Sequence, residues 1–139
     1  MNSRLDSFQA AVLLEKLKLF EDEVAARNRI ANRYSEQLGN HGIKTPLVID
    51  GGLSTWAQYT IEVPDRDTVM KKVKDKEIPC AAYYPLPTHL QTAYSEFPRS
   101  PDGLPNTEAA MKQVMALPMH AYLSDVDQDQ VIEAVISSL

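Results

Sequence analysis

A helical pattern that continues without a break over residues 6–39 most strongly limits how this chain of 139 residues can fold. Asp6 and Gln9 have the spacing of an N-terminal capping box, and apolar side chains recur at helical intervals as far as Leu38. An unbroken helix of that span would be ~50 Å long, whereas a compact domain of this size has a radius of gyration of about 14 Å. We therefore expect the helix to bend, near residues 20–23 where the apolar stripe shifts, or to project from the body.

The remainder of the chain alternates short strands with short helices. Gly39 and Gly42 are expected to supply the left-handed residues that end the long helix. Alternation places Trp56 on the opposite face of a strand from Tyr59. Strands are expected at 43–49, 55–63, 78–83 and 114–117, with helices at about 65–76, from an Asn106 cap, and from a Ser124–Asp127 capping box onward. This order predicts an α+β fold, in which a long N-terminal helix (residues 1–40) precedes a small, mainly antiparallel sheet covered by helices (residues 41–139).

Charge and composition exclude several classes of function. The 14 basic and 19 acidic residues give a net charge of −5 without a basic cluster, which argues against nucleic-acid binding. The longest uncharged stretch, residues 78–95, contains three prolines, and charged residues begin at Arg4, so we expect neither a membrane span nor a signal peptide. Since Cys80 is the single cysteine, no internal disulfide can form and a cytoplasmic location is expected.

Signatures of the common catalytic sites do not occur in this sequence. The five glycines form no phosphate-binding loop. The three histidines are far apart, and one cysteine cannot complete a zinc site with them, so we expect no metal. Cys80 lies in an apolar stretch, which is more typical of a small buried hydrophobe than of a nucleophile.

Two segments carry unusual chemistry. Residues 80–94 combine three tyrosines, a histidine and a glutamine with two prolines, which is typical either of a binding loop or of a stiffened surface crossing that covers the sheet edge. Asn2-Ser3-Arg4 stands directly before a helix N-terminus. Backbone N–H groups and a guanidinium favour an anion there, although an N-cap beside a solvated arginine is the simpler interpretation.

These segments together resemble the sugar aminotransferases of the DegT/DnrJ/EryC1/StrS family, pyridoxal-phosphate enzymes of the aspartate-aminotransferase fold. Asn2-Ser3-Arg4-Leu5-Asp6 matches the family's Asn-x-Arg-hydrophobic-Asp motif, and residues 9–17 and 27–38 match the helices that follow it. Residues 84–91 and 117–120 match two further signatures. The resemblance covers the whole chain but only the family's C-terminal third, which is its small domain in this fold type I architecture.

The resemblance also implies roles for individual residues. Family members share active sites across a homodimer, so Asn2 would bind the phosphate of the pyridoxal phosphate held by the opposite subunit. Arg4 would bind anionic parts of the substrate, and Tyr83 and Tyr84 would line the pocket for a nucleotide-linked sugar. Many relatives have histidine where Tyr83 stands, which leaves any acid–base role there open. His89 is expected to orient the loop more than to catalyse.

The resemblance further implies that the cofactor lysine lies upstream, in a large domain that this sequence does not contain. Such enzymes move an amino group from glutamate or glutamine to a keto group on a nucleotide-linked sugar. Because that lysine holds the cofactor and shuttles the proton, this chain alone contains no catalytic residue and should be inactive. One alternative interpretation is a non-catalytic dimerisation or ligand-binding module derived from the family. Another is a small nucleotide-binding protein that uses Arg4 and the tyrosines and binds a nucleotide-sugar as an isolated chain.

Residues 5–20 are expected to expose apolar surface, because in relatives they pack against the large domain and the partner subunit. The isolated chain should therefore self-associate or reposition this helix. Sedimentation that shows a monomer with the helix folded against its own sheet would contradict this expectation.

Overall fold

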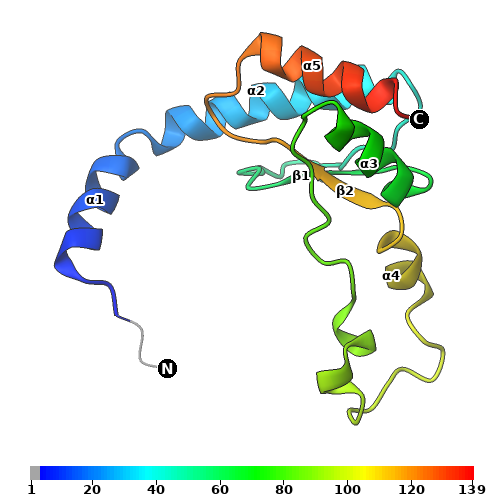
Figure 1. The fold of residues 1–139 in the computed structure, drawn as a ribbon. Helices are drawn as coiled ribbons and strands as arrows, with labels where there is room; N and C mark the ends of the chain where they lie inside the picture. Colours follow the sequence, from blue (N-terminus) through cyan, green and yellow to red (C-terminus); the bar gives the residue numbers. More distant parts are fainter. Residues whose placement is uncertain (1–3) are drawn as a thin grey trace.

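The long helical pattern forms two helices in the computed structural model, which describes residues 4–139. α1 (Ser7–Leu17) begins at Asp6, whose carboxylate accepts a hydrogen bond from the backbone N–H of Gln9 at 2.8 Å. α2 (Phe20–Gly39) follows after a break at Lys18 and Leu19, where the chain turns sharply (Figure 1). The expected bend is therefore confirmed, slightly before the stretch that the sequence indicated.

The end of α2 needs only one of the two expected left-handed glycines. Gly42 has a φ of 74°, and the next residue, Ile43, donates its N–H to the carbonyl of Leu38 at 3.2 Å. Gly39 is instead the last helical residue of α2, so its predicted left-handed conformation was wrong. A single turn of this kind satisfies a terminal carbonyl and directs the chain away from the helix axis.

The sheet is antiparallel, as expected, but smaller than the sequence predicts. β1 (Tyr59–Glu62) pairs with β2 (Val114–Leu117), with Tyr59 opposite Leu117. The predicted strands at 43–49 and 78–83 are reduced to isolated bridges, Lys44 with Glu62 and Ala81 with Ala116. Pro46 and Pro79 explain the difference, since a proline donates no N–H to a ladder and confines pairing to short stretches.

Trp56 is buried together with Tyr59, which corrects its predicted position on the opposite face of a strand from Tyr59. The residue has a φ of 49°, so the alternation of faces does not extend from β1 back to residue 56. Its ring lies 5.5 Å from that of Tyr59 and joins the core. The left-handed backbone therefore brings the Trp56 side chain to the same core as Tyr59, whereas strict alternation would place the two on opposite faces.

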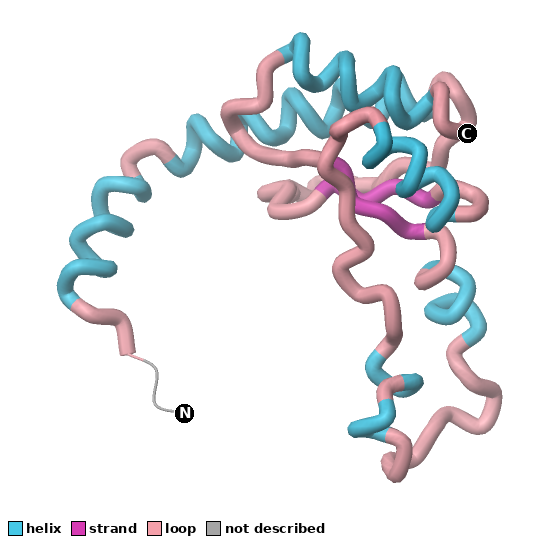
Figure 2. Tube along the Cα trace, viewed as in Figure 1, coloured by secondary structure: helices cyan, strands magenta, loops and turns pink. Residues whose placement is uncertain are grey.

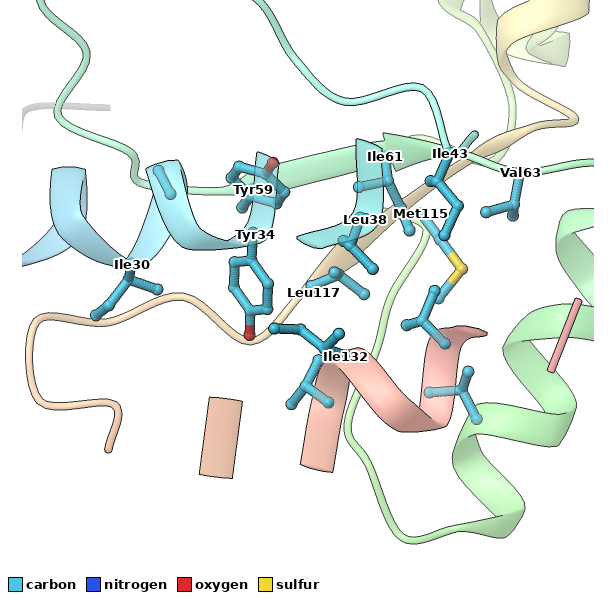
Figure 3. Close-up of a cluster of buried hydrophobic side chains, with 14 of the residues drawn as sticks. Ile30, Tyr34, Leu38, Ile43, Tyr59, Ile61, Val63, Met115, Leu117 and Ile132 are labelled. Atoms are coloured by element: carbon cyan, nitrogen blue, oxygen red, sulfur yellow. The ribbon is translucent and has the colours of Figure 1, made fainter. Parts of the chain in front are cut away.

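Three helices supply the core together with the inward face of the sheet (Figure 3). α2 packs against α5 (Asp125–Ile136), and α3 (Arg66–Asp75) packs against both α5 and β2. Tyr34 lies at the centre, with its ring 5.0 Å from Tyr59 and its hydroxyl donating to the carbonyl of Pro118 at 3.1 Å. The predicted α+β arrangement, a small antiparallel sheet covered by helices, is thereby confirmed.

The capping residues predicted from the sequence are correct at one helix start and wrong at another. Ser124 caps α5 as predicted, accepting the N–H of Asp127 at 3.1 Å. In α4 (Pro105–Ala110) the predicted Asn106 cap was wrong, because Leu104 is the N-cap and Pro105 occupies the first helical position. Proline already lacks the N–H that a capping side chain would satisfy, so the start of α4 does not need the asparagine.

Two parts extend from this body on the same side (Figure 1). One is α1, which contributes no buried residue and exposes the apolar side chains Phe8, Val12, Leu13 and Leu17, with exposed Leu5 just before its cap. The other is the arm, residues 84–104, which is mostly loop with two short 3₁₀ turns, Thr88–Leu90 and Thr92–Tyr94 (Figure 2). The exposed apolar surface expected of residues 5–20 is confirmed; the self-association expected from it stays a prediction.

The buried tyrosines predict how stability depends on pH. Burial raises the pKa of Tyr34 and of Tyr59, partly offset at Tyr59 by its hydrogen bond with Ser35. The unfolded chain releases these protons near pH 10 while the folded chain retains them, so the stabilisation is complete below pH 10 and lost above it. We expect the free energy of unfolding to fall by up to about 1.4 kcal/mol per pH unit for each tyrosine at higher pH.

Urea unfolding at several pH values between neutral and strongly alkaline measures this slope. Tyr34→Phe should flatten it above pH 10, because one of the two raised phenols is removed. An unchanged slope in that variant would show that Tyr34 does not contribute.

Candidate functional site

The pair Tyr83–Tyr84 lies where the chain leaves the sheet and enters the arm. The Ala81–Ala116 bridge fixes this segment beside β2, with backbone hydrogen bonds of 2.8 and 3.2 Å. Beyond it, Tyr83 is 58% and Tyr84 81% exposed. Both aromatic side chains are therefore positioned by the sheet but open to a ligand.

Three adjoining hollows are lined by one or both of these tyrosines. The first, of about 200 Å³, is lined by Tyr83 with Gln58, Cys80 and Met119, among others. A second, of about 70 Å³, contains both tyrosines, and a third, of about 510 Å³, begins at Tyr84 and continues into the arm. Neighbouring hollows have a lining tyrosine in common, so the three follow one another from the sheet to the arm, and together they are here called the elongated site.

His89 joins the two limbs of the arm. Its Nε2 atom lies 3.1 Å from Oε1 of Glu108 in α4, and its side chain is only 19% exposed. The same side chain contributes to the wall of the third hollow, here called the arm hollow. The contact joins the descending limb of the arm to α4, and the orienting role expected of His89 stays a prediction.

Arg4 stands apart from the tyrosines within this chain. It is exposed and precedes α1 in the chain. The N-terminal end of α1 lies away from the body, on the side to which the arm also extends (Figure 1). Asn2, the other residue of the expected anion site, lies outside the described residues. The structure thus brings together Tyr83, Tyr84 and His89, but it does not bring Arg4 to them.

No lysine lines these hollows in the described part of the chain. Lys18, Lys44 and Lys71 form ion pairs with exposed carboxylates. Lys72 and Lys76 donate to carbonyls at the C-terminal end of α5. The described lysines named here therefore bind partners away from the tyrosine-lined hollows.

Cys80 behaves as the sequence predicts. It is partly buried against the core, and burial raises the pKa of its thiol, an effect that nearby Lys74 reduces. Its Sγ donates to the carbonyl of Met70 at 3.7 Å. A raised pKa disfavours the thiolate, so this group is a poor nucleophile near neutral pH.

A polar brace behind the first hollow was missed by the sequence analysis. Arg27 donates to the carbonyl of Trp56 at 2.9 Å and to that of Met119 at 3.4 Å. Asn28 accepts the indole N–H of Trp56 at 3.0 Å and donates to the carbonyl of Ser54 at 3.0 Å. These bonds connect α2 to residues 26 to 92 positions away, a separation that local patterns do not reveal.

The brace gives a direct stability prediction. Asn28→Ala leaves the Trp56 indole N–H and the Ser54 carbonyl without their partner, which costs about 1–3 kcal/mol. Urea unfolding followed by tryptophan fluorescence measures this loss. Gln37→Ala, on an exposed position of the same helix, should change stability by less than about 0.5 kcal/mol, and equal losses in both variants would contradict the role of the brace.

Residues 4–139 contain no cluster of three or more potential metal ligands. Among the same residues, no helix is both long and apolar enough to span a membrane.

Comparison with known proteins agrees with this geometry. The model of the DegT/DnrJ/EryC1/StrS aminotransferase family matches residues 1–136. A UDP-2-acetamido-2-deoxy-3-oxo-D-glucuronate aminotransferase from Pseudomonas aeruginosa is 42% identical over 123 residues, which are 88% of this chain and 33% of that protein. The chain therefore spans about a third of the length of this curated relative, matching its C-terminal part.

Solved structures of similar proteins contain the same fold. An aminotransferase of this family from Brucella abortus is 48% identical with a TM-score of 0.91, covering 97% of this chain and 36% of that one. NtdA from Bacillus subtilis, solved with bound cofactor PMP, is 28% identical with a TM-score of 0.85, covering 99% of this chain and 33% of that one. The fold is thus that of the C-terminal region of fold type I aminotransferases.

Proposed function

Because the chain belongs to the DegT/DnrJ/EryC1/StrS aminotransferase family, we propose that it is the C-terminal part of a pyridoxal-phosphate-dependent sugar aminotransferase. The enzyme transfers an amino group from glutamate or glutamine to a keto group on a nucleotide-linked sugar, in polysaccharide or deoxysugar biosynthesis. The observation that carries the proposal is the match of 97% of this chain, at a TM-score of 0.91, to about a third of a family member that is 48% identical.

The residues of this chain supply the substrate side of the active site. Tyr83 and Tyr84 line the elongated site that starts at the sheet, and His89 holds the arm that continues it. Arg4 offers a guanidinium fork suited to carboxylate or phosphate. Pyridoxal phosphate, when bound by the whole enzyme, supplies the electron sink for amino transfer, and Asn2 would hydrogen-bond the phosphate of the cofactor in the opposite subunit.

The separation of Arg4 from Tyr83 supports a site shared across a homodimer. Within one chain these residues lie at the end of α1 and at the start of the arm, so a single copy does not close a pocket around both. The exposed apolar face of α1 is a surface that another protein part must cover. In the proposed enzyme a large domain and the partner subunit cover it, with residues 1–40 as the segment between domains and subunits and residues 41–139 as the small domain.

This division explains why the isolated chain should be inactive. The lysines of the described chain stand outside the tyrosine-lined hollows, and amino transfer requires one at the cofactor. The enzyme would act in the cytoplasm, where nucleotide-linked sugars are made and where a single free cysteine is usual.

A domain graft tests the proposal. This chain replaces the matching C-terminal third of the Pseudomonas aeruginosa aminotransferase, and the graft is assayed with glutamate and the sugar nucleotide of that parent enzyme. We expect amino transfer by the graft and none by the isolated chain. A graft that folds and binds pyridoxal phosphate but transfers no amino group would contradict the proposed function.

The isolated chain provides the complementary experiment. After incubation with pyridoxal phosphate and reduction with borohydride, mass spectrometry should find no stoichiometric cofactor on a single lysine. Such a modification would show that this chain contains the cofactor lysine.

The non-catalytic module remains the second candidate, because the apolar face of α1 would serve a pure dimerisation role equally well. It predicts a stable dimer of the isolated chain together with an inactive graft.

A further inference from the structure

The arm hollow carries chemistry that the tyrosine pair alone does not explain. It is the largest of the three adjoining hollows, at about 510 Å³, and lies within the size range of small-molecule sites. Both limbs of the arm contribute to its wall, Tyr84 to Tyr94 from the descending limb and Phe97 to Thr107 from the returning limb and α4. The His89–Glu108 contact connects these limbs.

Aromatic rings face this hollow without being buried. Phe97 is 64% exposed, and its ring lies 5.9 Å from that of Tyr94 at an interplanar angle of 53°. Tyr84 stands at the entrance, where the arm hollow meets the hollow beside the sheet. Open aromatic faces of this kind are surfaces on which a planar heterocycle stacks.

The wall of the hollow contains one cationic side chain. Arg99 is part of its wall, and no carboxylate lines it among the described residues. Guanidinium binds phosphate oxygens through paired hydrogen bonds, and its charge persists at any physiological pH. Aromatic rings, one arginine and the amide of Gln91 together suit a base joined to a phosphate group.

We propose that the arm hollow binds the nucleoside diphosphate of the substrate, with the base stacked on Phe97 and Tyr94 and the phosphates at Arg99. The sugar then extends past Tyr84 to Tyr83. In this orientation the nucleotide lies in the arm and the sugar lies beside the sheet. This inference rests on the proposed function, since a nucleotide-linked sugar is the substrate that it orients. It adds Phe97, Tyr94 and Arg99 to the residues expected to contact substrate.

Titration of the isotope-labelled 139-residue chain with UDP, followed by amide NMR, tests the assignment. The residues that carry the assignment, Tyr94, Phe97 and Arg99, all belong to this chain, so we expect UDP to bind it without the rest of the enzyme. At millimolar UDP we expect saturable shifts confined to residues 84–107. Shifts elsewhere only, or none, would overturn the proposal.

Single substitutions distinguish the contacts with the base from the contacts with the phosphates. Phe97→Ala should weaken UDP and uridine alike by about 10-fold, whereas Arg99→Gln should weaken UDP by about 10-fold and leave uridine unchanged. Tyr122→Ala and Lys71→Gln remove an exposed aromatic ring and an exposed charge elsewhere and should leave both affinities unaltered. Equal weakening of uridine and UDP by Arg99→Gln would overturn the phosphate assignment.

The graft distinguishes failure of this inference from failure of the proposed function. If the graft is active but Phe97→Ala and Arg99→Gln leave its KM for the sugar nucleotide unchanged, the nucleotide does not occupy the arm hollow. If UDP binds the arm as described while the graft transfers no amino group, the proposed function fails and the binding site stands.

Discussion

Tyr34→Ala is expected to lower the free energy of unfolding of this chain by about 4–6 kcal/mol. The side chain is fully buried, packs on Tyr59 and donates to the carbonyl of Pro118, so it joins α2 to the sheet and to the segment after β2. Truncation of a buried aromatic ring costs about 3–5 kcal/mol, and an orphaned carbonyl adds about 1 kcal/mol or more. Domains of ordinary stability have only about 5–15 kcal/mol in total.

Chemical unfolding followed by circular dichroism measures the loss. Tyr34→Phe retains the ring and should lose only about 1–2 kcal/mol. Tyr84→Ala, which truncates an exposed tyrosine, is the matched control and should change stability by less than about 0.5 kcal/mol. Similar losses for Tyr34→Ala and Tyr84→Ala would contradict the core described here.

The second large effect concerns Arg4 in the active graft. Arg4→Ala should lower kcat/KM for the sugar nucleotide by about 10- to 100-fold, because a charge-assisted hydrogen bond to an anion contributes about 1.5–3 kcal/mol. Arg4→Lys keeps the charge but loses the planar fork, so it should recover only part of the loss.

Steady-state kinetics with varied sugar nucleotide measure the effect. Lys18→Gln removes another exposed charge just after α1 and serves as the control, with an expected change of less than twofold. An Arg4→Ala graft with unchanged kcat/KM would remove Arg4 from the substrate site.

Local sequence signals correctly predicted the helix starts at which a nearby side chain accepts a hydrogen bond from the helix backbone. The Asp6 and Ser124 caps lie where the sequence indicated, and β2 has the predicted bounds. The predicted strands at 43–49 and 78–83 were wrong, since the prolines within them interrupt pairing. Trp56 was placed on the wrong face because alternation cannot register a left-handed residue ahead of the strand.

The sequence predicted the members of the candidate site that lie close together in the chain, but not those that only the fold brings together. Tyr83, Tyr84 and His89 were found because they share one proline-rich segment, and the structure gathers them around adjoining hollows. Arg99 was overlooked, although a cation in an aromatic stretch is a usable signal, and the Arg27–Asn28 brace depends on contacts across long separations. Arg4 stands apart from the tyrosines in one copy of this chain, so a site that contains all of them needs further parts of the protein.

Subunit mixing tests the proposed shared site most directly. One graft carries Arg4→Ala and a second has the parent's cofactor lysine replaced, so each alone is strongly impaired. If Arg4 serves the partner's cofactor site, random reassociation of equal amounts makes half of the dimers mixed, each with one intact site, and restores about a quarter of full activity. Mixed dimers that form but recover no activity would show that Arg4 acts within its own subunit.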